Sequence, residues 1–241
     1  MNMNAQIPDS KAFIRHVSAR EEAILHELRV KERILEHAQT PEGLSRFAAG
    51  FYFIRVNFVR LNFILGARCP NHELYWSGLA LNLMEELGGE KGPTHNELYR
   101  WFLQAAGIPN EENLLCPSFA AAFDEEWDSY CRETPLLEAL GAIAVYEIFD
   151  NPDYRMLLEA MQGAGVGERG LIFFRVHAKA EHFELFEKFF EHANQTPAGV
   201  SALHRATEFV VNAQRKMWSN LLEWMEQHQD FLLPVPALQA H

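Results

Sequence analysis

Hydrophobic residues recur every three to four positions along almost the whole chain, and no segment alternates between hydrophobic and polar residues over a sustained length. Spacings of three and four place apolar side chains on one face of an α-helix, whereas strict alternation indicates a β-strand. The segment from 10 to about 37 is typical, because Phe13, Val17 and Ile24 form one inner stripe. The sequence therefore predicts an almost entirely helical protein.

Capping and turn residues divide this pattern into separate helices. Thr40 before Pro41 indicates a helix start, since a threonine side chain caps free amides and proline fits the first turn. Thr94 is a second such cap, and Asn151 followed by Pro152 predicts a further start. The predicted helices are 10 to about 37, 41–66, 71 to about 88, 95–106, 118–131, 135–149, 151–163, 170 to about 194 and 197 to about 230.

The loops between these helices are short, and no repeat or low-complexity linker interrupts the chain. The 241 residues are enough for one large domain with a buried core. We therefore predict a single helical domain at 10–231, a flexible N-terminus at 1–9 and a loose tail at 232–241. The most apolar stretch, 47–67, contains Arg55 and Arg60 within it, so we expect a core helix rather than a membrane span.

The charge balance and the cysteines limit the partners and the compartment. Lys and Arg number 21 against 33 Asp and Glu, a net charge of −12, which argues against nucleic acid and anionic membranes as partners. Three widely spaced cysteines fit reduced thiols, and the N-terminus lacks the features of a signal peptide. We expect a cytoplasmic protein. The amphipathic faces of its terminal helices are compatible with a homodimer or with internal packing.

Three clusters of carboxylates and histidines could carry chemistry. His177, Glu181 and Glu184 are spaced i, i+4 and i+7, so they share one helix face and any pair could bind a metal ion. His182 lies roughly 140° around the helix from His177, and Glu184 is therefore the preferred third donor. The alternative is an ordinary solvated helix face.

The second cluster lies where one helix ends and the next begins. Glu85 and Glu86 precede a glycine-rich turn, and His95 follows it. A turn that folds back would bring a carboxylate and an imidazole together, and a cation would offset two carboxylates placed unfavourably at a helix C-terminus. An acidic helix end with a surface histidine is the alternative.

The third cluster is a single residue, Glu147, in an otherwise uncharged stretch. Burying it would be costly unless it is paired, protonated or bound to a metal, whereas an exposed position would need no partner. Carboxylates from several helices with one or two histidines per metal are the usual setting for paired iron or manganese. Zinc is less favoured, because a structural zinc site prefers cysteines and no Cys-x-x-Cys occurs.

The order and separation of these segments resemble the heme-oxygenase-like diiron oxidase and oxygenase family, whose fold is shared with the TenA and PqqC proteins. The resemblance rests on Asn-Leu-Met-Glu-Glu-Leu-Gly-Gly with Thr-His-Asn-Glu-Leu-Tyr, then Val-Tyr-Glu, then His-Ala-Lys-Ala-Glu-His-Phe-Glu, and it covers residues from about 50 to 190. It implies an all-α fold, a single-domain heme-oxygenase-like helical bundle.

The resemblance also implies a ligand set. The implied metal ligands are Glu85, His95, Glu147, His177, Glu181 and Glu184. The last of these is a departure, because the family usually has a histidine where this chain has Glu184, and this change bears on the affinity and reactivity of the second metal. Glu86 and His182 remain alternatives to two of these ligands.

The activity implied by the resemblance is that of an O2-dependent nonheme diiron oxidoreductase. Two Fe(2+) ions per chain would activate O2, the co-substrate, to oxidise a small carboxylate substrate that is amino-acid-derived or fatty-acid-like, in natural-product biosynthesis. Tyr52, Arg55 and Tyr146 are the candidate substrate-binding residues. An arginine can grip a substrate carboxylate at two points, although it pairs more often with a carboxylate of the protein.

Two other functions remain open. The first is a metal-free enzyme of the same fold, such as a TenA-like hydrolase or a PqqC-like oxidase; a TenA-like reaction would need a cysteine nucleophile, for which Cys131 is the candidate. The second is a non-catalytic helical binding protein, in which the carboxylates and histidines would lie on different sides of the bundle.

Overall fold

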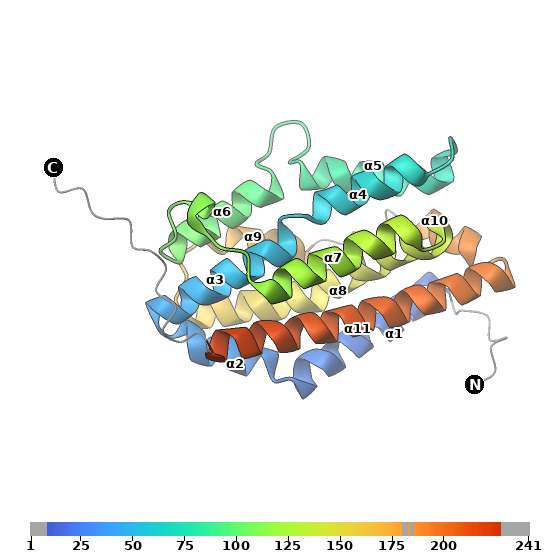
Figure 1. Cartoon of the computed structure of the whole chain (residues 1–241). Coiled ribbons are helices and arrows are strands. Elements are labelled where there is room, and N and C mark those ends of the chain that lie inside the picture. Colours follow the sequence, from blue (N-terminus) through green and yellow to red (C-terminus); the bar gives the residue numbers. More distant parts are fainter. Residues whose placement is uncertain (1–8, 180–182, 184–185, 228–241) are drawn as a thin grey trace.

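The structure is a computed structural model that describes residues 9–179, 183 and 186–227 (Figure 1). Every regular element within these residues is a helix, so the predicted all-α class is confirmed. The elements are α1 (Ser10–Glu27), α2 (Val30–Ala38), α3 (Pro41–Arg55), α4 (Phe58–Arg68), α5 (Glu73–Glu86), α6 (His95–Ala105), the 3-10 helix η1 (Glu111–Asn113), α7 (Ser118–Glu133), α8 (Leu136–Gly163), α9 (Ile172–Lys179), α10 (Glu187–Ala193) and α11 (Pro197–Gln227). The predicted terminal segments 1–9 and 232–241 lie outside the described residues, except for Asp9, which caps α1.

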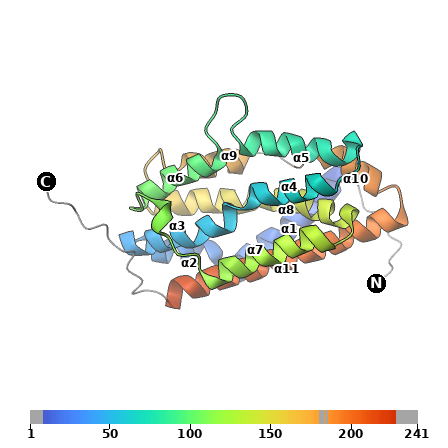
Figure 2. The ribbon, with the colours of Figure 1, turned by 45° about the horizontal axis from the view of Figure 1, so that its top comes forward.

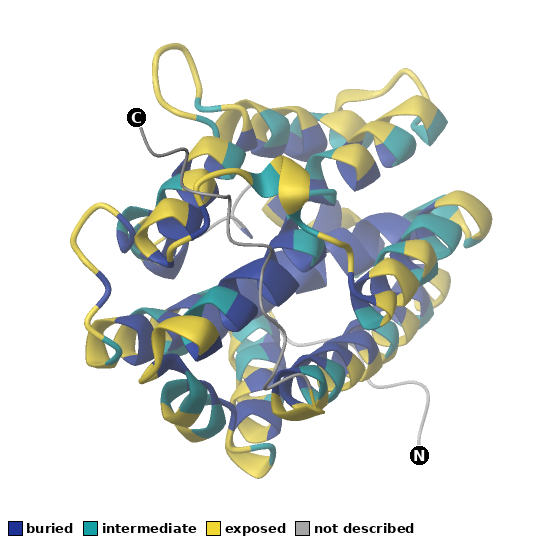
Figure 3. Ribbon diagram, turned by 60° about the vertical axis from the view of Figure 1, so that its left-hand side comes forward, coloured by how far each residue is buried: buried dark blue, intermediate teal, exposed yellow. Residues whose placement is uncertain are grey.

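Helix α8 is the centre of the bundle. It packs against α1, α2, α4, α7, α9 and α11, and every residue from Glu138 to Asp150 is buried. Figures 1 and 2 show α1 and α11 along one side of α8 and α4 with α5 along the other. Buried residues gather inside the bundle and exposed residues on its outer faces (Figure 3). A helix segment that is apolar all round requires such a position, so the charged residues within it, Glu138, Glu147 and Asp150, are also buried.

The prediction of a helix break at Asn151 and Pro152 is wrong, because α8 continues through both residues to Gly163. Proline lacks the amide hydrogen for an intrahelical bond and crowds the carbonyl four residues earlier, which usually ends a helix. Burial on both sides of Pro152 outweighs this local cost, since Phe149 and Tyr154 are both packed in the core. The continuous helix keeps its acidic residues in one helical register.

Two helices predicted as continuous are each divided in the structure. Arg29 adopts φ of 51°, a left-handed conformation, and separates α1 from α2. A second break at Val56 and Asn57 separates α3 from α4. Hydrophobic periodicity continues across both breaks and therefore gives no signal of them. The second break matters for the site, because it leaves Arg55 at the last position of α3.

The predicted caps at Thr40 and Thr94 agree with the structure. The Thr40 side chain accepts a hydrogen bond from the Gly43 amide at the start of α3. Thr94 forms a reciprocal capping box with Glu97 at the start of α6. The predicted helix from 170 to about 194 corresponds to α9 and α10, and five of the residues between these two helices lie outside the described part of the chain.

One stretch, Pro41–Arg68, has the length and composition that would allow a membrane crossing, with a mean hydropathy of 1.2 in its most apolar window. This stretch comprises α3 and α4, and 61% of that window is buried inside the structure. Such burial is expected of helices in a packed core, as the arginines within the stretch already indicate.

Candidate metal centre

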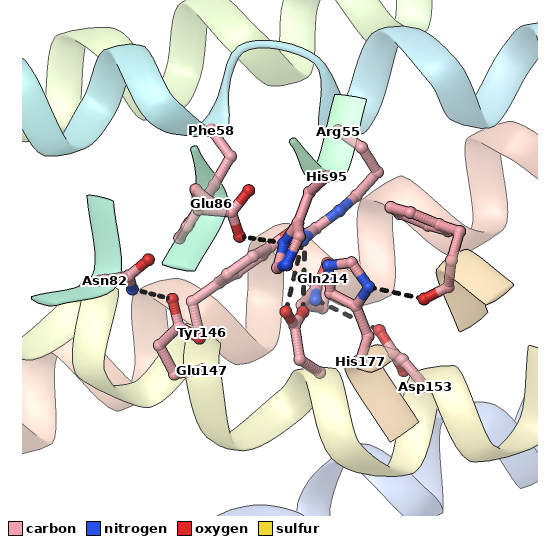
Figure 4. Close-up of polar contacts among 12 residues, drawn as sticks. Arg55, Phe58, Asn82, Glu86, His95, Tyr146, Glu147, Asp153, His177 and Gln214 are labelled. Atoms are coloured by element: carbon pink, nitrogen blue, oxygen red, sulfur yellow. Dashed lines mark hydrogen bonds and ion pairs between the residues drawn. The ribbon is translucent and has the colours of Figure 1, made fainter. Parts of the chain in front are cut away.

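Three side chains from three different helices converge inside the bundle. Glu86, His95 and His177 each offer one ligand atom, and these atoms lie within 4.8 Å of one another. The Glu86 Oε1 atom lies 3.0 Å from His95 Nδ1, and the two imidazole ring centroids are 4.4 Å apart. All three residues are buried, and Figure 4 shows their side chains pointing toward one another. Two imidazoles and one carboxylate form a common donor set for ferrous iron.

The turn between α5 and α6 brings Glu86 and His95 together. Gly88 and Gly89 adopt φ of 84° and 59°, and a Cβ at Gly88 would lie 2.4 Å from the Gly92 carbonyl oxygen. Only glycine fits there, because other residues would be strained and would clash. The chain then reverses in a projecting loop, visible in Figures 1 and 2, and α6 begins at His95.

The resemblance implies Glu85 as the helix-end ligand, with Glu86 as an alternative, and in the structure it is Glu86 that lies beside His95 and His177. Successive residues of a helix are roughly 100° apart, so the two carboxylates cannot face the same point. Glu85 is exposed, whereas Glu86 shares the buried face of α5 with Leu79 and Asn82. Asn82 and Glu86 are one helical turn apart, so both lie on the face of α5 that packs against the bundle, and Glu85 does not.

His177 is oriented by a bond to its own helix. Its Nδ1 atom lies 2.8 Å from the Phe173 carbonyl oxygen, and the Tyr154 ring stacks on the imidazole at a centroid distance of 4.4 Å. With Nδ1 donating to the carbonyl, Nε2 carries the electron pair that a metal would use. The remaining predicted residues of this helix, Glu181 and Glu184, lie outside the described residues, as does His182.

Glu147 is buried, as its position in an apolar stretch allows, and its Oε1 atom accepts a hydrogen bond from Asn82 Nδ2 at 2.5 Å. Asn82 lies one turn before Glu86 on α5, so Glu147 faces the same side of that helix. Glu147 is not part of the three-residue group. In Figure 4 it lies with Asn82 beside the group.

The predicted substrate-binding arginine has a partner within the protein. Arg55 Nη2 lies 3.3 Å from Asp150 Oδ2, and its Nη1 donates to the Tyr146 hydroxyl at 2.5 Å. Burial alone would lower the pKa of Arg55, but the Asp150 carboxylate outweighs it and holds that pKa well above its usual value. The structure therefore shows the alternative that the sequence left open, an ion pair within the protein. Asp150 itself was missed, although it stands three residues after Glu147.

A small cavity of about 10 Å³ adjoins the three-residue group. Glu86, His95 and His177 line it together with Tyr52 and Arg55, among others. A space of this size holds about one water molecule or one ion. The donor set and the cavity therefore have the size and chemistry for a single metal ion, which Glu86, His95 and His177 could hold.

The cysteine proposed for a metal-free reaction does not suit a nucleophile. Cys131 is fully buried, and burial raises the pKa of its thiol to about 12. A nucleophilic cysteine must be a thiolate near neutral pH and accessible to its substrate. The TenA-like alternative thus loses its candidate residue.

The fold and the three-residue group together define a helical-bundle protein with a buried place for a metal ion. A family model described as "iron-containing redox enzyme" matches residues 45–196, more than half of the chain. The chain belongs to this family of iron-containing redox enzymes. No curated protein matches the sequence.

Solved structures share the fold. A domain of unknown function with a heme oxygenase-like fold from Shewanella denitrificans OS217 has a TM-score of 0.74 at 13% identity, over 96% of this chain and 100% of its own. A CADD-like protein of unknown function from Nostoc punctiforme PCC 73102 gives TM-scores of 0.70 and 0.72 in two crystal structures, at 14% and 13% identity. Those matches cover 88% and 91% of this chain and 98% of the other. The predicted heme-oxygenase-like fold is confirmed.

Proposed function

We propose that the chain is a nonheme diiron oxidase or oxygenase that uses O2 to oxidise a small carboxylate substrate, amino-acid-derived or fatty-acid-like, in natural-product biosynthesis. The observation that supports it best is the buried group of Glu86, His95 and His177 in a family of iron-containing redox enzymes. Bound ferrous iron would supply the electrons for O2 chemistry. The protein residues would hold the metal and the substrate and exclude bulk water.

The first iron would bind Glu86, His95 and His177. Their burial keeps water from the ion except through the adjoining cavity, which strengthens electrostatic interactions with the metal. The bond from His177 Nδ1 to the Phe173 carbonyl oxygen fixes the imidazole, as outer contacts of metal-binding histidines commonly do.

The second iron would bind carboxylates. Glu147 is the buried candidate, and Asn82 holds one of its oxygens; Glu181 and Glu184 would complete the set. Carboxylates suit paired cations, because they bridge and change their mode of binding as charge develops. A site without imidazole binds ferrous iron less tightly than one with two, so we expect two unequal iron affinities.

The substrate carboxylate would bind near Tyr52 and Arg55, which line the small cavity beside the three-residue group. Arg55 already pairs with Asp150 and bonds Tyr146, so a substrate carboxylate would have to compete with Asp150 for the guanidinium. Tyr146 also lines a second cavity of about 10 Å³ with Phe58 and Trp127. A space of this size holds about one water molecule, so the apolar part of a substrate would fit there only if these aromatic walls moved apart.

Iron binding is the first test. Anaerobic titration with Fe(2+), followed by metal analysis, is expected to show about two ions per chain, with a change in absorbance on exposure to O2. Glu86→Gln and His177→Ala should weaken the tighter class of iron by more than about tenfold. Glu85→Gln is the matched control, since the exposed neighbour should leave binding unchanged.

The outcome that contradicts the proposal is fewer than about one tightly held iron per chain with no response to O2. Equal losses of iron affinity in Glu85→Gln and Glu86→Gln would contradict the assignment of Glu86, rather than Glu85, as the metal ligand. If iron binds as expected, mass-spectrometric screening of amino acids and fatty acids with the ferrous protein and O2 identifies the substrate.

A further inference from the structure

A pair of buried acids lies outside the proposed metal ligands. Glu21 of α1 is 0% exposed and Asp153 of α8 is 4% exposed, and their carboxyl groups lie close enough for a hydrogen bond between them if one of them carries a proton. The Trp218 Nε1 atom donates to Glu21 Oε1 at 3.2 Å, and Gln214 Nε2 donates to Asp153 Oδ2 at 3.4 Å. Each carboxyl group therefore has one oxygen held by α11 and one oxygen left over.

The two remaining oxygens, Glu21 Oε2 and Asp153 Oδ1, receive no N–H or O–H donor from the described residues. Two ionised carboxylates are both acceptors and cannot bond each other. A hydrogen bond between the two carboxyl groups needs a proton, and one shared proton would satisfy both oxygens. Carboxyl pairs that share a site commonly hold one proton in this way.

The surrounding charges do not replace this proton. The charged groups that act on the pair are Arg55 from α3, Asp150 from α8 and Arg215 from α11. Arg55 already forms an ion pair with Asp150, and Arg215 is bonded to Glu27 at 2.7 Å. Ionising both acids would therefore leave two negative charges in the core with no cation of their own, which is costly.

We propose that Glu21 and Asp153 form a one-proton site that fastens α1 to α8 and α11, and that losing this proton as the pH rises loosens the bundle beside the metal centre. Asp153 directly precedes Tyr154, whose ring stacks on His177, so the acid pair adjoins a residue of α8 that packs against the candidate metal centre. This site does not depend on the proposed iron chemistry.

The direction in which pH changes the stability follows from the raised pKa values of Glu21 and Asp153. Burial raises the pKa of Glu21 from 4.5 to about 7, and burial together with Glu21 raises the pKa of Asp153 well above its usual value. Acids whose pKa is raised on folding stabilise the folded state fully below the unfolded pKa, and this stabilisation is lost as the pH rises through the folded pKa. The loss is therefore expected between about pH 5 and pH 8.

Thermal unfolding of the full chain from pH 5 to pH 9, at constant ionic strength, tests the proposal. The Tm of the wild type is expected to fall by about 5 °C across neutral pH through this site. Glu21→Gln should reduce the fall in Tm with pH, and its Tm at pH 9 should equal or exceed that of the wild type. The reason is that the glutamine amide can donate a hydrogen bond to Asp153 at any pH in this range. Asp153→Asn is the reciprocal variant and should behave alike.

Glu138→Gln is the matched control, since Glu138 is also a buried acid of α8 but has Arg205 as its cation at 2.5 Å. This variant should lower the Tm and keep the wild-type fall across neutral pH. Glu21→Gln with an unchanged fall, or with a Tm below the wild type at pH 9, overturns the proposal.

Infrared spectroscopy of the wild type provides a measurement that needs no variant. The carbonyl stretch of a buried protonated carboxyl group should be present at pH 6 and lost by pH 9. Its absence at pH 6 overturns the shared proton even if every variant fails to fold.

Discussion

At the scale of single residues, two buried phenols close to the metal centre differ in one bond. Tyr99 donates its hydroxyl hydrogen to the Ala48 carbonyl oxygen at 2.9 Å. The Tyr154 hydroxyl is buried and has no hydrogen-bond partner among the described residues. Burial raises the pKa of both phenols well above the usual value, so both remain protonated. The Tyr154 ring packs on His177 and under Arg55, while its hydroxyl stabilises nothing described.

The two tyrosines are expected to respond oppositely to loss of the hydroxyl. Tyr154→Phe keeps the stacking on His177 and removes an unsatisfied polar group, so the free energy of unfolding should stay equal or rise by about 1 kcal/mol. Tyr99→Phe should lower it by about 1 kcal/mol, because the Ala48 carbonyl loses its donor. Urea denaturation measures both, and a clear loss in Tyr154→Phe would point to a partner for its hydroxyl.

At the residue scale, the sequence predicted which segments would meet but not which carboxylate would face His95. Spacing and composition predicted that a helix-end carboxylate would meet His95, and the structure brings them together. The choice between Glu85 and Glu86 depended on which face of α5 is buried, a property set by neighbouring helices. The partner of Arg55 likewise depended on contact between α3 and α8, which no local pattern encodes.

At the scale of helices, two glycines in neighbouring helices differ in their surroundings, Gly50 in α3 and Gly66 in α4. Gly50 of α3 faces α11, where an added Cβ would lie 2.8 Å from the Trp224 ring and 2.9 Å from Leu221 Cδ1. Gly66 of α4 is exposed, and an added Cβ would meet nothing within 4 Å. Only the first allows two helices to approach closely.

Alanine substitutions separate these roles. Gly50→Ala should destabilise the protein by about 1–3 kcal/mol, because the α3 to α11 contact has to shift. Gly66→Ala should stabilise it by about 0.5–1 kcal/mol through helix propensity. Thermal or urea unfolding of both variants provides the comparison, and the same sign for both would show that the helix contact is not the cause.

The sequence predicted where helices form better than it predicted where they break or continue. The caps at Thr40 and Thr94 are local interactions and were predicted. The break predicted at Pro152 is wrong, because the cost of a proline inside the helix is outweighed by packing on both sides of it in α8. The break at Arg29 has no signal in the sequence, since arginine does not favour a left-handed conformation.

At the scale of the whole molecule, the metal centre joins three parts of the bundle. Glu86 ends α5, His95 begins α6 and His177 lies on α9, so an ion bound to all three would link these helices. A ligand that binds only the folded state raises its stability by mass action.

Added metal should therefore stabilise the chain. At 100 times its dissociation constant, Mn(2+), a redox-stable substitute for iron, should raise the free energy of unfolding by about 2.7 kcal/mol. Thermal unfolding with and without Mn(2+) measures the effect, and a chelator should reverse it. Glu86→Gln should abolish most of the shift, whereas Glu85→Gln should retain it; no shift in the wild type would argue against binding by the folded centre.

The short turn between α5 and α6 has a consequence for synthesis in the cell. Glu86 and His95 belong to one hairpin, which leaves the ribosome well before α9 does. The nascent chain therefore offers only two of the three donors until His177 emerges. Tight capture of an ion would have to wait for α9, and premature loading with the wrong metal would be disfavoured for as long as the last donor is missing.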